Sequence, residues 1–154
     1  MNELQVQIVK LEPMRVAAAY GFGHSPELAA WENLINWARP KGYLDDPKNL
    51  RIFGFNNPDP SHGSPNYGYE FWLEVGPDVE PEGEVRIQSF SGGLYAVTDC
   101  VGVENITPTW KKLVAWLAES KYGNGRHQWL EQHLSPDGTP LEALQLDLFL
   151  PITE

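Results

Sequence analysis

The sequence predicts an α+β fold in which one strand–helix–strand–strand unit occurs twice. Three observations lead to this prediction. The chain contains an internal repeat, and each copy shows strand-like alternation around one amphipathic helix. A third is that 154 residues with 42% apolar and 12% aromatic side chains suffice for one packed core. We therefore expect a single domain over residues 1–154, with repeat halves at about 1–76 and 83–154 related by a pseudo-two-fold axis.

The repeat is found by displacing the sequence against itself by 79 residues. Trp31 then coincides with Trp110, and Trp37 coincides with Trp116. Near the end of each copy the displacement becomes 77, which places residues 70–73 over residues 147–150. Because tryptophan is scarce, two matches in one register indicate a duplication, and two copies are too few for a solenoid.

Each copy is expected to begin with a β-hairpin. Glu12-Pro13 supplies the first turn, and the Ser-Gly-Gly sequence at 91–93 supplies the second. The hairpin strands are predicted at 6–11 and 15–22 in the first copy, and at 85–90 and 94–101 in the second.

One helix and two further strands complete each copy. Ser25 and Thr107 each place a capping hydroxyl before a proline at the first helical position. The last strands are predicted at 50–55 with 67–75, and at 129–134 with 144–150. The result is an antiparallel sheet with two main helices on one face and a ligand groove on the other. Trp37 and Trp116, at the flank of each apolar helix stripe, either seal the core or form a dimer contact, so a monomer and a dimer both stay open.

Composition excludes several classes of function. The 21 acidic and 11 basic residues give a net charge of −10, which repels phosphate backbones and argues against direct nucleic-acid binding. No apolar run approaches 18 residues and no basic-then-apolar start is present, so we expect neither a membrane segment nor a secretory signal. Cys100 is the one cysteine, and the four histidines are scattered. We expect a cytoplasmic protein with no cofactor and no metal.

The alternation of the last strands points to a site. Glu70 and Trp72 in the first copy, and Asp147 and Phe149 in the second, lie on the face away from the helices. A two-fold arrangement brings these acids and rings toward one central groove. A neighbouring strand also places an acid and aromatic residues at alternate positions, namely Trp129, Glu131 and His133.

Carboxylates among aromatic rings suit a flat or bulky organic cation. The rings attract the cation by about 0.5–2 kcal/mol each, and the cation compensates the partly desolvated carboxylate. The alternative is that these acids are ordinary polar residues on the wet face of a sheet. For Glu131 a surface helix over 126–134 is a further alternative.

Three segments resemble the GyrI-like family, which comprises gyrase-inhibitory proteins and the effector-binding domains of multidrug-sensing AraC-type and MerR-type activators. The segments read SGGLYAV at 91–97, LEQHL at 130–134 and DLFLP at 147–151, and the resemblance covers residues 3 to 152. It implies that Glu131 is the central acidic ligand contact, with Asp147 and Phe149 as the second acid and aromatic. Two departures affect the geometry of a family ligand: His133 replaces a family tyrosine, and Asp147 is shorter than the family glutamate.

Three functions follow. The first is a stand-alone small-molecule-binding protein that captures hydrophobic, aromatic or cationic compounds for drug or toxin sensing or protection. The second, implied by the resemblance, is a hydrolase of strained cyclopropane-bearing electrophiles, in which Glu131 acts as general acid or base and His133 or Tyr95 orients water or substrate. The third is inhibition of gyrase or another topoisomerase by protein–protein contact, in which the acidic surface of this chain docks on the basic enzyme.

Overall fold

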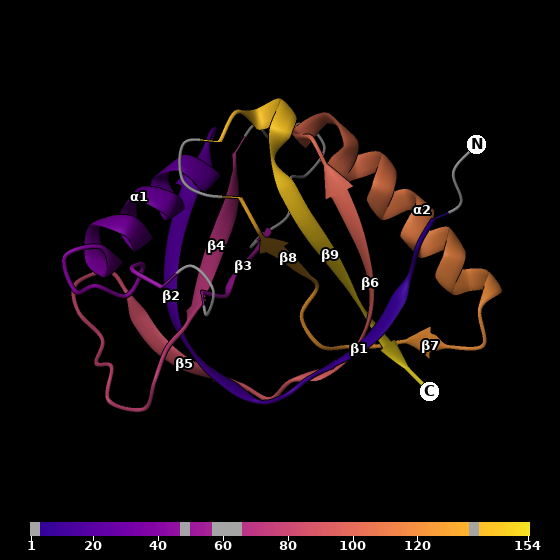
Figure 1. Cartoon of the computed structure of the whole chain (residues 1–154), viewed down its shortest axis with the longest axis horizontal. Helices are drawn as coiled ribbons and strands as arrows, with labels where there is room; N and C mark the ends of the chain where they lie inside the picture. The colour runs from indigo at the N-terminus through magenta and orange to yellow at the C-terminus, as the bar shows by residue number, and fades with distance from the viewer. Residues whose placement is uncertain (1–3, 47–49, 57–65, 136–138) are drawn as a thin grey trace. The chain divides into compact units, whose positions relative to one another are not determined.

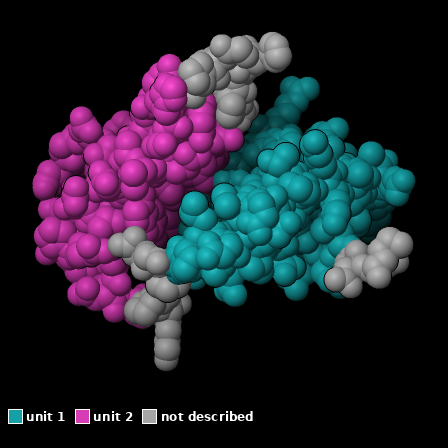
Figure 2. Space-filling view, turned by 90° about the horizontal axis from the view of Figure 1, so that it is seen from above, with its two compact units in different colours: residues 1–13, 91–154 teal, residues 14–90 magenta. Residues whose placement is uncertain are grey.

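The computed structural model describes residues 4–46, 50–56, 66–135 and 139–154, and it confirms the α+β class. The chain forms two compact units, coloured separately in Figure 2. Unit 1 consists of residues 1–13 and 91–154, and unit 2 consists of residues 14–90. The division falls at residues 13/14 and 90/91, whereas the sequence repeat divides the chain between 76 and 83.

Unit 2 is an antiparallel sheet with one helix on one face. Its strands run in the order β3-β4-β2-β5, and α1 lies along β2 and β4 (Figure 1). Leu34 and Trp37 of α1 pack on Phe71 of β4, which forms the core of the unit. The bounds are β2 (Met14–Gly23), α1 (Pro26–Ala38), β3 (Ile52–Asn56), β4 (Tyr67–Glu74) and β5 (Arg86–Phe90).

Unit 1 repeats this plan with additions. Its strands run in the order β1-β6-β9-β8, and the short β7 also pairs with β9. Leu113 and Leu117 of α2 pack on Leu148 and Leu150 of β9. The bounds are β1 (Gln7–Leu11), β6 (Gly93–Val101), η1 (Val103–Asn105), α2 (Ile106–Glu119), β7 (Gly123–Asn124), β8 (Leu130–His133), η2 (Leu141–Ala143) and β9 (Gln145–Thr153).

The prediction of an N-terminal hairpin in each copy is wrong, because the two strands of each expected hairpin do not pair with each other. Strand β1 pairs with β6 of the second copy, and β2 of the first copy pairs with β5 of the second. The two copies therefore exchange their first strands. Gly92 permits this crossing, because it has a φ of 80° and because a Cβ there would collide with the backbone of Leu11 and Glu12.

Both helices lie where the periodicity predicts, but their caps differ from the prediction. Helix α1 begins at Pro26 as expected, although Ser25 makes no side-chain cap hydrogen bond. Helix α2 begins at Ile106, after η1, so Thr107 lies inside the first turn instead of capping it. Within the described ranges, no helix combines the length and apolarity needed to cross a membrane.

Candidate functional site

The register of β8 against β9 decides which side chains of unit 1 share a face. Glu131 stands opposite Leu148 and His133 stands opposite Leu146, and both leucines belong to the core under α2. Directly opposed residues in an antiparallel pair project to the same side. Glu131 and His133 therefore face α2, whereas Asp147 and Phe149 project from the other side of β9. The candidate ligand contacts Glu131 and His133 therefore lie on the opposite face of the unit 1 sheet from the candidate contacts Asp147 and Phe149.

Glu131 lies among tryptophan rings. Trp110, in the second turn of α2, donates its indole N–H to Glu131 Oε2 at 3.1 Å. The rings of Trp110 and Trp129 lie 5.2 Å apart at 41°, and Trp129 is 45% exposed. The carboxylate itself is half-buried on strand β8, so the alternative of a surface helix over 126–134 is wrong. We call Trp110, Trp129 and Glu131 the Glu131 cluster.

His133 lies two residues from Glu131, on the same face of β8. Burial lowers the pKa of its imidazole to about 4, so the ring is neutral at pH 7. Cys100 stands opposite Leu146 from the β6 side and belongs to the same core. Burial raises the pKa of the Cys100 thiol more than a hydrogen bond with Thr109 lowers it, and the charge of Glu131 adds to the rise, so the thiol stays protonated.

Tyr95 does not accompany Glu131. It is fully buried on the opposite face of the sheet, where its ring meets Phe149 edge-on with centroids 5.4 Å apart. Its hydroxyl donates to the backbone carbonyl of Gln128. Burial raises the pKa of this phenol, so it remains protonated. The expectation that Tyr95 orients water beside Glu131 is therefore wrong.

Asp147 faces a second acid. It stands directly opposite Asp99 of β6, and the two side chains project to the same face. Burial first, and the charge of Asp99 second, raise the pKa of the Asp147 carboxyl. This pair lies on the face with Phe149, away from α2.

In unit 2, Glu70 carries a buried carboxylate. It is 3% exposed and lies on the face away from α1, as predicted. Trp72 donates its indole N–H to Glu70 Oε2 at 2.7 Å, and Arg86 Nη2 lies 3.1 Å from Glu70 Oε1. The rings of Phe55 and Phe90 contact Trp72 at centroid distances of 4.9 and 5.3 Å. We call Glu70, Trp72 and Arg86 the Glu70 cluster.

Sequence reasoning missed two members of these clusters, Trp110 and Arg86. The sequence repeat aligns Trp110 with Trp31, so this residue could be singled out from the sequence. Its contact with Glu131 could not, because it depends on which face of β8 lies against α2. Arg86 begins strand β5. The sequence pairs this strand with the next strand of its own copy, whereas the structure pairs it with β2, which brings Arg86 close to Glu70. That Glu70, Trp72, Asp147 and Phe149 line one central groove stays a prediction from the repeat.

The equivalent positions in unit 2 carry different residues from those of the Glu131 cluster. Gly54 stands opposite Phe71 in unit 2, as Glu131 stands opposite Leu148 in unit 1. The Tyr69 side chain fills the space that a Cβ at Gly54 would occupy. The repeat-equivalent of Trp110, Trp31, packs its ring against Phe71 at 5.1 Å. The two copies have thus diverged at this position.

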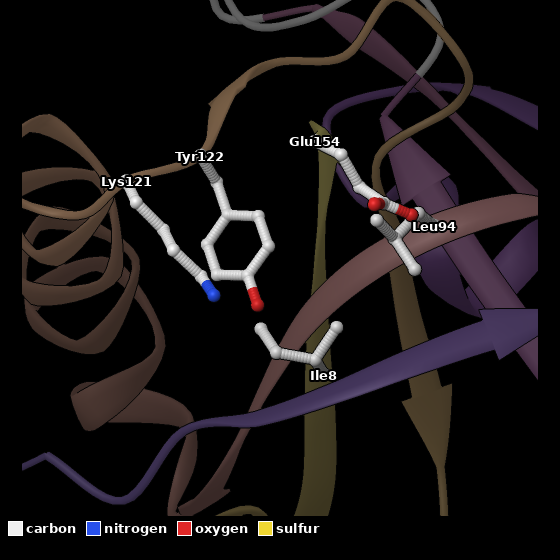
Figure 3. A pocket seen from close by; sticks show the side chains of 5 residues that line it. All are labelled: Ile8, Leu94, Lys121, Tyr122 and Glu154. Atoms are coloured by element: carbon white, nitrogen blue, oxygen red, sulfur yellow. The ribbon is translucent and has the colours of Figure 1, made fainter.

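A separate cavity of about 420 Å³ opens on unit 1. Figure 3 shows the Lys121 ammonium and the Tyr122 hydroxyl pointing toward Ile8, and the ammonium lies 5.4 Å from the Tyr122 ring centroid. The lining residues are Ile8, Leu94, Lys121, Tyr122 and Glu154, none of which the sequence singled out as a ligand contact. In the part of the chain that the structure describes, no three histidine, cysteine or carboxylate side chains are grouped as a metal site requires.

Several solved structures share the fold. The EcmrR chain in its complex with DNA has a TM-score of 0.73 and 12% identity, over 97% of this chain and 57% of that one. A hydrolase from Listeria innocua has a TM-score of 0.69 and 13% identity, over 99% and 94% of the two chains. SAV2435 bound to tetraphenylphosphonium has a TM-score of 0.55 and 12% identity, over 97% and 94%. This chain therefore spans a little over half the length of EcmrR.

Sequence comparison is decisive at the family level. A search of curated protein sequences finds no match. The profile described as a GyrI-like small molecule binding domain matches residues 4–153. Because this match extends over almost the whole chain, the protein belongs to the GyrI-like family of small-molecule-binding domains.

Proposed function

We propose that this small-molecule-binding domain captures hydrophobic organic cations at the Glu131 cluster, as part of drug or toxin sensing or protection. One observation carries the proposal: the half-buried carboxylate of Glu131 accepts the N–H of Trp110, whose ring lies 5.2 Å from the ring of the exposed Trp129. A flat or bulky organic cation can pack an apolar surface against such a ring while its charge lies near the carboxylate.

The energies favour a cation that is large and weakly hydrated. Each well-placed indole face contributes about 0.5–2 kcal/mol of cation–π attraction, and more as water is excluded. The Trp110 N–H that already holds one oxygen of Glu131 is uncharged, so it orients the carboxylate without neutralising it. A small hydrated ion would gain little from the rings, because it keeps its own water.

Two neighbours are compatible with this proposal. SAV2435 carries tetraphenylphosphonium, which is a lipophilic cation with aromatic groups. EcmrR was solved in a complex with DNA, whereas the net charge of −10 on this chain repels a phosphate backbone. Capture of the compound, and not contact with DNA, is therefore the role that we assign to this chain.

The test is a titration of the protein with tetraphenylphosphonium, followed by tryptophan fluorescence and by calorimetry. We expect saturable binding that Glu131→Gln weakens about tenfold, which corresponds to the loss of one charge interaction at a partly buried site. Glu119→Gln, at the exposed end of α2, removes the same charge and serves as the control. Absence of saturable binding, or equal affinity in Glu131→Gln, would contradict the proposal.

A second candidate is hydrolysis of strained cyclopropane-bearing electrophiles. The observation that favours it is the pair formed by Glu131 and the neutral His133 on one face of β8, because a neutral imidazole can orient a water molecule whose proton the Glu131 carboxylate accepts. One neighbour is described as a hydrolase. Mass spectrometry after incubation with such an electrophile would detect a ring-opened product that contains one added water. Product formed equally by Glu131→Gln would eliminate this candidate.

The third alternative, a topoisomerase partner, depends on the acidic composition and stays a prediction. A pull-down with purified topoisomerase at increasing salt is its direct test, because attraction between opposite charges weakens as salt rises.

A further inference from the structure

The second acid–aromatic cluster already contains a cation, and that cation belongs to the chain. Arg86 Nη2 lies 3.1 Å from Glu70 Oε1, while the Trp72 indole N–H occupies Oε2 at 2.7 Å. The guanidinium therefore stands beside the buried carboxylate, where the charge of a cationic ligand would be most favourable.

The sheet explains how Arg86 reaches this position. Ala18 of β2 stands opposite Trp72 on one side and opposite Arg86 on the other, so the three side chains form one row. Since alanine contributes only a methyl group to this row, the long arginine side chain can extend across β2 toward Glu70. A larger residue at position 18 would stand in its path.

The two partners differ sharply in exposure. The Glu70 side chain is 4% exposed, whereas the Arg86 side chain is 56% exposed. The carboxylate is thus held by its surroundings, while the guanidinium can move into water without breaking the core. Arginine also shares the properties of an aromatic organic cation, because its charge is delocalised, it is weakly hydrated and it stacks on rings.

We propose that Arg86 is a specificity-determining residue, which acts as an internal counter-cation that competes with cationic ligands for Glu70. An aromatic ligand without charge meets no such competition. This inference rests on the proposed small-molecule binding, and it assigns to unit 2 a charge preference that differs from that of the Glu131 cluster. Removing the positive charge of Arg86 should then convert the Glu70 cluster into a site that favours organic cations.

The test compares two probes of similar shape, tetraphenylphosphonium and the uncharged triphenylphosphine oxide. We expect Arg86→Gln to tighten binding of the cation about tenfold or more, and to change binding of the neutral probe less than about threefold. Glutamine keeps an N–H donor for Glu70 while removing the charge. Lys41→Gln serves as the control, since Lys41 forms an exposed ion pair with Glu82 at 2.9 Å in the same unit.

A double-mutant cycle locates the effect. In a Glu70→Gln background, Arg86→Gln should no longer change the affinity for the cation, because the carboxylate for which Arg86 competes is absent. If Arg86→Gln fails to give a cooperative thermal transition, Arg86→Lys replaces it. Lysine is more strongly hydrated and lacks the planar fork, so it should leave Glu70 more readily and tighten cation binding about threefold.

The inference is overturned if neither Arg86 variant changes cation affinity, if both probes gain equally, or if the gain persists without Glu70. The failure of the broader proposal looks different. If Glu131→Gln leaves cation binding unchanged while Arg86→Gln still tightens it, the Glu131 cluster is the wrong site and the role of Arg86 stands. If Glu131→Gln weakens cation binding and Arg86→Gln has no effect, the Glu131 cluster is the binding site and the role proposed for Arg86 is wrong.

Discussion

Trp110 and Trp72 perform the same chemical task in the two units. Each donates its indole N–H to a carboxylate, Trp110 to Glu131 and Trp72 to Glu70. The two tryptophans are not equivalent in the repeat, which aligns Trp110 with Trp31. An acid held by a tryptophan therefore arose at two different positions of the duplicated unit, on opposite faces relative to the helix.

His133 leads to a prediction about pH. Burial lowers the pKa of its imidazole to about 4 from an ordinary value of 6.5. Between these values the unfolded chain binds a proton that the folded chain excludes, so stability is lost as the pH falls through this window. We expect this residue to cost about 1–3 kcal/mol of unfolding free energy between pH 7 and pH 4.

Urea denaturation at a series of pH values measures this cost. His133→Asn should flatten the pH dependence of the unfolding free energy between pH 6.5 and pH 4, relative to the unmodified protein. His24→Asn, which changes an exposed histidine, is the matched control. Identical curves for His133→Asn and the unmodified protein would show that the imidazole is not desolvated.

At the scale of elements, the exchange of first strands between the two copies determines the fold. The local signals at 12–13 and 91–93 are those of hairpin turns, but the chain uses them as crossings between units. Glycine serves either purpose, because a positive φ is needed both in a tight turn and where two backbones pass closely. Local turn chemistry therefore could not distinguish the two topologies.

Gly92→Ala tests the crossing. A Cβ at position 92 would collide with the backbone of Leu11, and the φ of 80° is unfavourable for alanine. We expect a loss of about 1–3 kcal/mol or more in the free energy of unfolding, measured with urea. Gly76→Ala is the matched control, because its Cβ would meet nothing within 4 Å. Equal stability of the two variants would contradict the close approach.

At the scale of the whole molecule, strand exchange ties the two sequence repeats together. A fragment of residues 1–80 contains β1 without its partner β6 and lacks β5, and the complementary fragment 81–154 lacks β1. Each fragment exposes a sheet edge that the intact chain covers.

We therefore expect neither fragment alone to unfold cooperatively. An equimolar mixture should regain the far-ultraviolet circular dichroism and the thermal transition of the intact chain. A cooperative transition in one isolated fragment, near the transition of the intact protein, would show that the exchange does not stabilise the units.

Much of this protein could be predicted from its sequence. The repeat, the two helices, the last two strands of each copy and their apolar rows under the helices all follow from periodicity, which is a local property. The family followed from three short segments in a fixed order. Glu70 and Trp72 were placed on one face correctly, because they lie on the same strand two residues apart.

Contacts between strands were decided only by tertiary structure. Whether Glu131 shares a face with Leu148 or with Asp147 depends on a register shift of one residue, and the same shift moves every side chain of β8 to the other side. The partner of β1 and the reach of Arg86 across Ala18 are likewise set by pairings between distant segments. The alternation of side chains along one strand depends only on the sequence of that strand. Its register against a neighbouring strand depends on how the whole core packs.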